Sequence, residues 1–202
     1  MRNPRKNLLI AALLIALPLA ACAVPEEDVR NAENALEQAT EAEAPVYAPE
    51  AFAAARDTLG AAKAEIAAQR EKVLVTRSYD DARALLAEAE EQAVAAQETA
   101  AEEKERVRFE ASQSLESARS GVDDLRGLLT ELAECPRQPK GFSGDLERLA
   151  GQADAIEDEL ATAQDTFDAG DLHTASAAAS AVLERIEALS ADLTSAKEKI
   201  RC

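Results

Sequence analysis

The sequence has no tryptophan, one histidine and one methionine, and aromatic residues make up only 3% of its 202 residues. Large globular cores depend on bulky side chains, because each of them buries a large apolar area. The apolar fraction is 47%, but much of it is alanine, which favours helices and buries little area. The composition therefore argues against a compact globule with a deep substrate pocket.

Positive charge is also scarce. The chain carries 22 Lys and Arg against 39 Asp and Glu, which gives a formal net charge of −17. A surface this acidic repels nucleic acid phosphates and anionic lipid headgroups. We expect no nucleic acid partner, and we expect any charged partner to be basic or cationic.

Glycine and proline, seven of each, gather mostly at segment ends, and no stretch alternates like a half-buried strand. Apolar residues instead recur at steps of three and four, in series that begin at Val29, Phe52, Tyr79, Leu146 and Ala175. The second series ends at Val73 and has Gln69 as its one polar member. The third series begins Tyr79, Ala82, Leu86, Ala89, Ala93, Ala96 and Ala100. This spacing is typical of helices that pack against one another. It predicts an all-α fold with helices over 26–43, 49–76, 79–134, 143–168 and 171–200.

The third predicted helix is unusually long, at about 55 residues or roughly 80 Å. By length, helix 49–76 folds back over its first half and helix 143–168 over its second half. The apolar seam changes step near residue 108, where an insertion locally unwinds a supercoil. We therefore predict an elongated antiparallel coiled coil: two spectrin-like three-helix bundles, 22–107 and 108–202, that share one central helix.

The first 21 residues have the pattern of a signal peptide. Arg2, Arg5 and Lys6 precede an apolar run of about ten residues, whereas a helix that spans a bilayer needs about 20. Removing residues 1–21 takes away these three positive charges and no acidic residue, so the formal net charge changes from −17 to −20. We expect the mature chain to begin after this segment.

The run Leu19-Ala20-Ala21-Cys22 resembles the lipobox of bacterial lipoprotein precursors. The resemblance implies that the thiol of Cys22 receives a diacylglyceryl group and that cleavage occurs before it. It also implies sorting to the outer membrane, because Ala23 rather than Asp follows the cysteine. The alternative is an ordinary secretory signal whose cleavage site happens to precede a cysteine.

Two further cysteines, Cys135 and Cys202, follow the ends of the third and fifth predicted helices. In the predicted bundle both arrive at the same tip, in an oxidising compartment, so we expect them to form a disulfide. Closing a loop of about 66 residues should stabilise the fold by about 3–4 kcal/mol. The alternative is two separate thiols, which can also pair between chains; no Cys-x-x-Cys motif is present.

No residue pattern indicates catalysis or a cofactor. His173 is the single histidine, and Asp171 alone does not complete a catalytic or metal site with it. The acidic runs lie on helical faces where Lys and Arg are interleaved, which is typical of solvated surfaces. The sequence predicts a protein that is not an enzyme and that has no cofactor or metal site.

The loop between Cys135 and Gly144 is a small region that combines basic and aromatic residues. Arg137, Lys140 and Phe142 lie within it. In an acidic protein such a loop is a candidate contact for a partner. The alternative is a plain connection between two helices.

Three motifs together resemble the DUF4398 family of bacterial envelope lipoproteins: the lipobox at Cys22, Tyr47-Ala48-Pro49 and Tyr79-x-x-Ala82. The resemblance covers about residues 26–105. It implies an Ala-rich helical segment in the cell envelope and no established activity. Some family members precede a peptidoglycan-binding domain, whereas this chain continues into a second helical half, so that binding is not implied here.

These observations predict a periplasmic lipoprotein, anchored in the outer membrane by the lipid on Cys22, that acts as a non-enzymatic structural spacer or protein-docking rod. Its partner is expected to be an unidentified envelope protein. A homo-oligomer formed through exposed seam residues is an open alternative. The alternative is an acidic binding module for a basic protein, peptide or cation in the periplasm. Salt separates the two, because exposed charge pairs are screened and apolar contacts are not.

Overall fold

A computed structural model describes residues 23–136 and 138–201, and all regular structure within these ranges is helical. The predicted all-α helical bundle, with one long helix packed against several others, is confirmed. The predicted signal peptide, residues 1–21, lies outside the described residues. The chain divides into two compact units between Glu103 and Lys104, four residues before the predicted boundary at 107.

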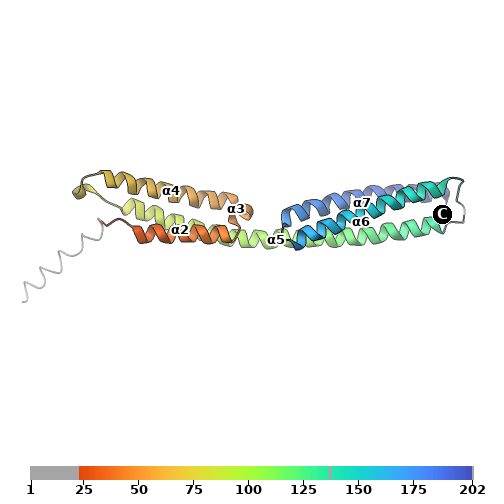
Figure 1. The fold of residues 1–202 in the computed structure, drawn as a ribbon, viewed down its shortest axis with the longest axis horizontal. Helices are drawn as coiled ribbons and strands as arrows, with labels where there is room; N and C mark the ends of the chain where they lie inside the picture. The colour runs from red at the N-terminus through yellow and green to blue at the C-terminus, as the bar shows by residue number, and fades with distance from the viewer. Residues whose placement is uncertain (1–22, 137, 202) are drawn as a thin grey trace, which may run out of the picture. The chain divides into compact units, whose positions relative to one another are not determined.

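Unit 1 is a bundle of α2 (Glu26–Glu41), α4 (Pro49–Glu71) and the first part of α5 (Asp80–Ala133), with the short helix α3 (Ala44–Tyr47) between α2 and α4 (Figure 1). Most of its buried side chains are alanines, which let helix backbones approach closely. The few larger ones are clustered toward the end where α5 begins. The buried core residues are Ala32, Ala35, Ala55, Leu59, Ala62, Ile66, Tyr79, Ala82, Leu86, Ala89 and Ala93.

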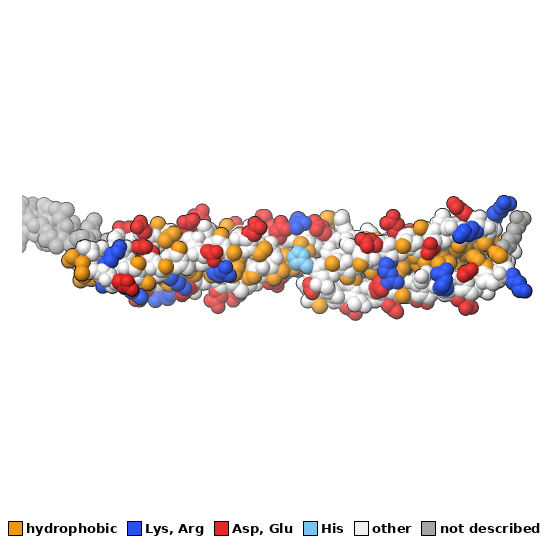
Figure 2. Space-filling view, turned by 90° about the horizontal axis from the view of Figure 1, so that it is seen from above, with side chains coloured by type: hydrophobic (Ala, Val, Ile, Leu, Met, Phe, Trp, Pro, Cys, Tyr) orange, Lys and Arg blue, Asp and Glu red, His pale blue; other side chains and the backbone are white. Residues whose placement is uncertain are grey.

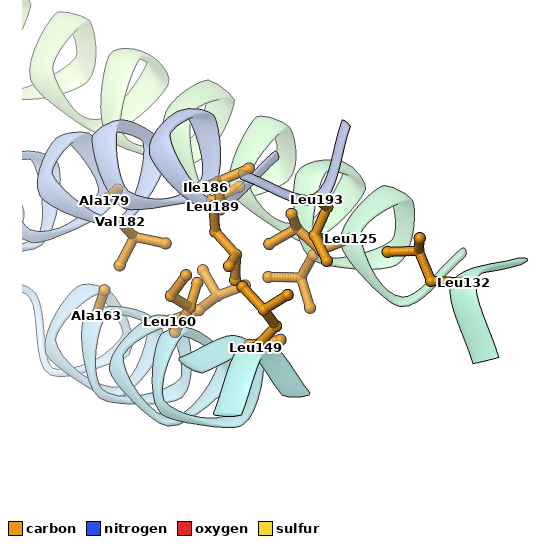
Figure 3. Close-up of a cluster of buried hydrophobic side chains, with 14 of the residues drawn as sticks. Leu125, Leu132, Leu149, Leu160, Ala163, Ala179, Val182, Ile186, Leu189 and Leu193 are labelled. Atoms are coloured by element: carbon orange, nitrogen blue, oxygen red, sulfur yellow. The ribbon is translucent and has the colours of Figure 1, made fainter. Parts of the chain in front are cut away.

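Unit 2 consists of the second part of α5, α6 (Phe142–Asp168) and α7 (Leu172–Ile200). Its core contains more leucine, isoleucine and valine than that of unit 1, so each position buries more apolar area. Figure 3 shows these side chains projecting from all three helices into one cluster. The labelled members are Leu125, Leu132, Leu149, Leu160, Ala163, Ala179, Val182, Ile186, Leu189 and Leu193.

The turn between α6 and α7 follows from local sequence. Gly170 adopts a left-handed backbone (φ 88°), which ends α6 at no steric cost because glycine has no Cβ. The carboxylate of Asp171 then accepts a hydrogen bond from the amide of Thr174 at 3.2 Å and caps α7. The predicted helices 143–168 and 171–200 therefore agree with α6 and α7 to within one residue.

The predicted helix 26–43 is too long at its C-terminal end, because α2 ends at Glu41 and α3 begins at Ala44. Glu43 between them has a left-handed backbone (φ 61°), which reorients the chain. Pro45 suits the first turn of α3, since the amides of a first helical turn need no partner within the helix. This extra helix was not predicted.

The predicted helix 49–76 is also wrong at its end, because α4 stops at Glu71 and the turn η1 (Leu74–Thr76) follows it. The guanidinium of Arg77 donates hydrogen bonds to the carbonyl oxygens of Arg70 (2.7 Å) and Lys72 (2.9 Å). These bonds satisfy carbonyls that the helix end leaves without partners. A side chain beyond the helix thus ends α4 earlier than the apolar series suggested.

Two glycines within α5 give a matched test of the packing of unit 2. A Cβ added at Gly121 would lie 2.8 Å from Cγ2 of Ile186, whereas one added at Gly127 would meet nothing within 4 Å. Gly127→Ala should raise the free energy of unfolding by about 0.5–1 kcal/mol, because alanine favours helix. The free energy of unfolding of Gly121→Ala should be about 1–3 kcal/mol lower than that of Gly127→Ala, because the branched Ile186 cannot easily move away.

Chemical denaturation of both variants followed by circular dichroism measures this difference. Equal stabilisation by the two substitutions would contradict the close approach of α5 and α7 at Gly121.

Candidate functional site

Of the three cysteines with a predicted role, the structure describes only Cys135. Cys22 and Cys202 lie outside the described residues. Cys135 is only 6% exposed, belongs to the core cluster of unit 2 and is disulfide-bonded. Ile200, two residues before Cys202, is a member of the same cluster. This proximity favours the pairing of Cys135 with Cys202, which stays a prediction.

The candidate contact loop before α6 is only partly as expected. Lys140 is exposed, and Arg137 lies outside the described residues. Phe142 is 7% exposed and packs in the core of unit 2, so little of its ring is accessible, and its role as a partner contact stays a prediction. The physical reason is that α6 begins at Phe142 itself, which turns the ring inward with the helix.

A groove of about 370 Å³ lies beside this loop, between α6 and α7. Leu149 and Ile200 provide apolar surface in it, and Arg148 and Lys199 add positive charge to a protein that is otherwise acidic. Asp145 and Asp192 also line the groove, so the charge there is mixed. The sequence did not reveal this groove, because its residues come from helix faces far apart in the chain.

His173 is exposed in the first turn of α7. Within residues 23–136 and 138–201, no group of three or more His, Cys, Asp or Glu side chains is placed to hold a metal ion. Over the same ranges, no helix combines the length and apolar character needed to cross a bilayer.

The start of the described chain is tied firmly to unit 1. The guanidinium of Arg83 in α5 donates a hydrogen bond to the carbonyl oxygen of Ala23 at 3.0 Å. The same guanidinium lies 3.8 Å from the carboxylate of Asp28 and 3.5 Å from that of Asp80. Val24 packs against the apolar core of the unit. The fold therefore begins one residue after the predicted lipidation site at Cys22.

A groove of about 340 Å³ adjoins this start of the chain, between α2 and α4. Val24 and Val29 line it from one side, and Ile66 and Arg70 line it from the other. The beginning of α2 and the end of α4 are therefore neighbours in unit 1.

The turn between α4 and α5 exposes three consecutive apolar side chains, which we call the apolar turn: Val73, Leu74 and Val75. They are 67%, 66% and 91% exposed. The sequence prediction placed Val73 in a buried seam and the other two in the same continuous helix; Val73 is instead exposed, and Leu74 and Val75 lie in the separate turn η1. Three large apolar residues in a row depart from the spacing of three and four, and this was the signal that could have revealed the turn.

Comparison with protein-family models, curated proteins and solved structures finds no match for this chain. The resemblance to DUF4398 therefore stays a prediction.

The disulfide can be tested by peptide mapping without reduction, which should recover Cys135 joined to Cys202 of the same chain. Replacing both cysteines by serine should lower the free energy of unfolding by about 3–4 kcal/mol, because the unfolded chain regains the freedom of the closed loop. Cys135 joined to Cys22, or to a second chain, would contradict the predicted pairing.

Proposed function

We propose that this chain is a periplasmic lipoprotein, anchored in the outer membrane by the lipid on Cys22, whose helices act as a non-enzymatic spacer and docking scaffold in the cell envelope. The proposal is supported by the lipobox pattern, the helical units and the hydrogen bond that Arg83 donates to the carbonyl of Ala23. It combines the cellular location that the lipobox predicts with the short connection between Cys22 and the first helical unit.

The observation that carries the proposal is the hydrogen bond between Arg83 and the carbonyl oxygen of Ala23. A lipoprotein that works as a mobile domain needs a flexible linker between its lipid and its fold. Here the carbonyl of Ala23 is bonded by Arg83, and α2 begins at Glu26. The acyl chains on Cys22 would therefore hold the first helical unit directly at the membrane. A direct hold of this kind suits a structural element that presents a surface at a defined place.

The surface that would be presented is acidic and helical. Figure 2 shows acidic side chains (red) along both units, with basic side chains (blue) between them. Several carboxylates pair with cations of a neighbouring helix, such as Glu33 with Lys63 in unit 1 and Glu157 with Arg126 in unit 2. Such exposed pairs contribute little stability to the fold.

The acidic surface also supports the alternative of a binding module for a basic protein, peptide or cation. The first turn of α2 alone carries Glu26, Glu27 and Asp28. Electrostatic capture weakens strongly between 50 and 500 mM salt, where the Debye length falls from about 14 to about 4 Å. Retention of a bound envelope partner at high salt favours the docking scaffold, and its release favours the binding module.

The membrane address is tested by substitutions at Ala23, whose side chain is exposed. Ala23→Asp should move the lipidated protein from the outer to the inner membrane fraction, because Asp after the acylated cysteine acts as a retention signal in lipoproteins. Ala23→Ser is the matched control and should stay in the outer membrane. Membrane fractionation gives the location, and mass spectrometry of the N-terminal peptide gives the state of Cys22.

An unmodified Cys22 in the exported protein would overturn the proposed anchor. Outer membrane location of both Ala23 variants would overturn the proposed sorting but not the anchor.

A further inference from the structure

We propose that the apolar turn inserts into the phospholipid bilayer beside the acyl anchor and gives the protein a second membrane contact. This inference rests on the proposed lipidation of Cys22. It assigns a role to the three consecutive side chains of Val73, Leu74 and Val75, which are mostly exposed and belong to no buried core cluster of unit 1.

The position of the turn is the first argument. α2 and α5 both begin at the end of unit 1 where α4 ends, and the turn joins these last two helices there (Figure 1). Arg83, four residues into α5, holds the carbonyl of Ala23 at this same end. A lipid on the adjacent Cys22 would therefore bring the turn to the membrane surface. In Figure 2, hydrophobic side chains (orange) are exposed at this end of the unit.

The conformation of the turn is the second argument. The guanidinium of Arg77 is bonded to the carbonyl oxygens of Arg70 and Lys72, across the base of the turn. The hydroxyl of Thr76 donates to the carbonyl of Val73 at 3.0 Å. Because the free protein already holds the turn in place, insertion requires little further ordering of the backbone.

A buried glutamine completes this support. Gln69, the one polar residue predicted in the seam of α4, is 6% exposed. Its side-chain oxygen accepts a hydrogen bond from the amide of Ser78 at 3.2 Å, and its nitrogen donates to Glu65 at 2.6 Å. The side chain therefore ties the end of α4 to the start of α5. A polar residue in an apolar seam is explained by its support of the turn.

The charge around the turn is the third argument, and it identifies the bilayer as the partner. Residues 70–77 carry three positive charges, on Arg70, Lys72 and Arg77, and one negative charge, on Glu71, in a chain whose net charge is −17. The guanidinium of Arg77 is used within the turn, whereas Arg70 and Lys72 carry basic side chains that can extend toward anionic headgroups beside the inserted apolar ones. Asp28 and Asp80, the carboxylates nearest to Arg83, are already paired with it.

The further acidic residues at this end of the unit are Glu26, Glu27 and Asp81, in the first turns of α2 and α5. They oppose adsorption of the unlipidated chain to anionic membranes. The turn is therefore expected to insert only when the acyl chains already hold the protein at the surface.

The experiment uses the absence of tryptophan from the chain. Val75→Trp introduces one fluorophore at the most exposed position of the turn. Val46→Trp is the matched control, since Val46 is 56% exposed and lies in α3, at the other end of unit 1. Both full-length lipidated proteins are reconstituted into phosphatidylethanolamine–phosphatidylglycerol vesicles, with and without brominated acyl chains.

We expect brominated chains to reduce the emission of Val75→Trp about twofold, as for a side chain at the headgroup–acyl boundary, and to leave Val46→Trp unchanged. Equal quenching of the two variants, or none for Val75→Trp, would overturn the inference. A blue-shifted emission of Val75→Trp that bromine does not quench would place the turn against protein and would also overturn it.

Mass spectrometry of the same samples separates this inference from the proposed function. Acylated Cys22 with an unquenched Val75→Trp overturns only the membrane contact of the turn. Unmodified Cys22 overturns the anchor and, with it, the bilayer as the occupant of the turn.

Discussion

The close packing of alanines is the constraint on which unit 1 depends. Ala62, Ala82 and Ala93 are completely buried, and a larger side chain at any of these positions would push the helices apart. Each buried alanine contributes little apolar area, so the alanine seam fixes the alignment of the helices more than it adds stability. The larger side chains, among them Tyr79 and Leu86, gather toward one end of the unit.

That distribution explains why polar ties are concentrated at the same end. Gln69 joins the end of α4 to the start of α5, and Arg83 joins α5 to the first residue after the predicted lipidation site. The bulky core provides a firm base for these contacts. Unit 2 has leucines and isoleucines along its seam and a disulfide at Cys135, and ion pairs such as Arg126–Glu157 also join its helices. The two units thus reach stability by different means from the same helical pattern.

Much of the helical architecture could be predicted because the apolar period reports directly on burial. Every seam residue predicted from Tyr79, which directly precedes α5, to Ala100 within it is buried. The period says nothing about where a helix must stop, however. α4 ends at Glu71 because Arg77 caps its carbonyls from a distance, and no local pattern encodes that contact.

The candidate site was harder to predict, for a related reason. Phe142 looked like a surface aromatic in a basic loop, yet the first turn of α6 carries it into the core. Val75 looked like a helical residue, yet it is 91% exposed. In both cases the decisive factor was the position of a helix end. When a helix end shifts by a few residues, a side chain near it changes from buried to exposed or the reverse.

An acidic chain that is held at a membrane must overcome its own repulsion from anionic lipid. The proposed arrangement does so by placing the acyl group, the apolar turn and the cations of residues 70–77 at one end of unit 1. The remaining acidic surface would then face the periplasm, where it is accessible to other proteins. Anchor, turn and surface charge are in this way parts of one physical account.

The central claim is that the fold starts immediately after Cys22, with no flexible linker. Hydrogen exchange of the lipidated protein tests it most directly. The account predicts that the amide of Val29, which is bonded to the carbonyl of Pro25, exchanges as slowly as those in the middle of α2. Replacing Arg83 by alanine should accelerate exchange there first. Rapid exchange of Val29 in the unaltered protein would contradict the account.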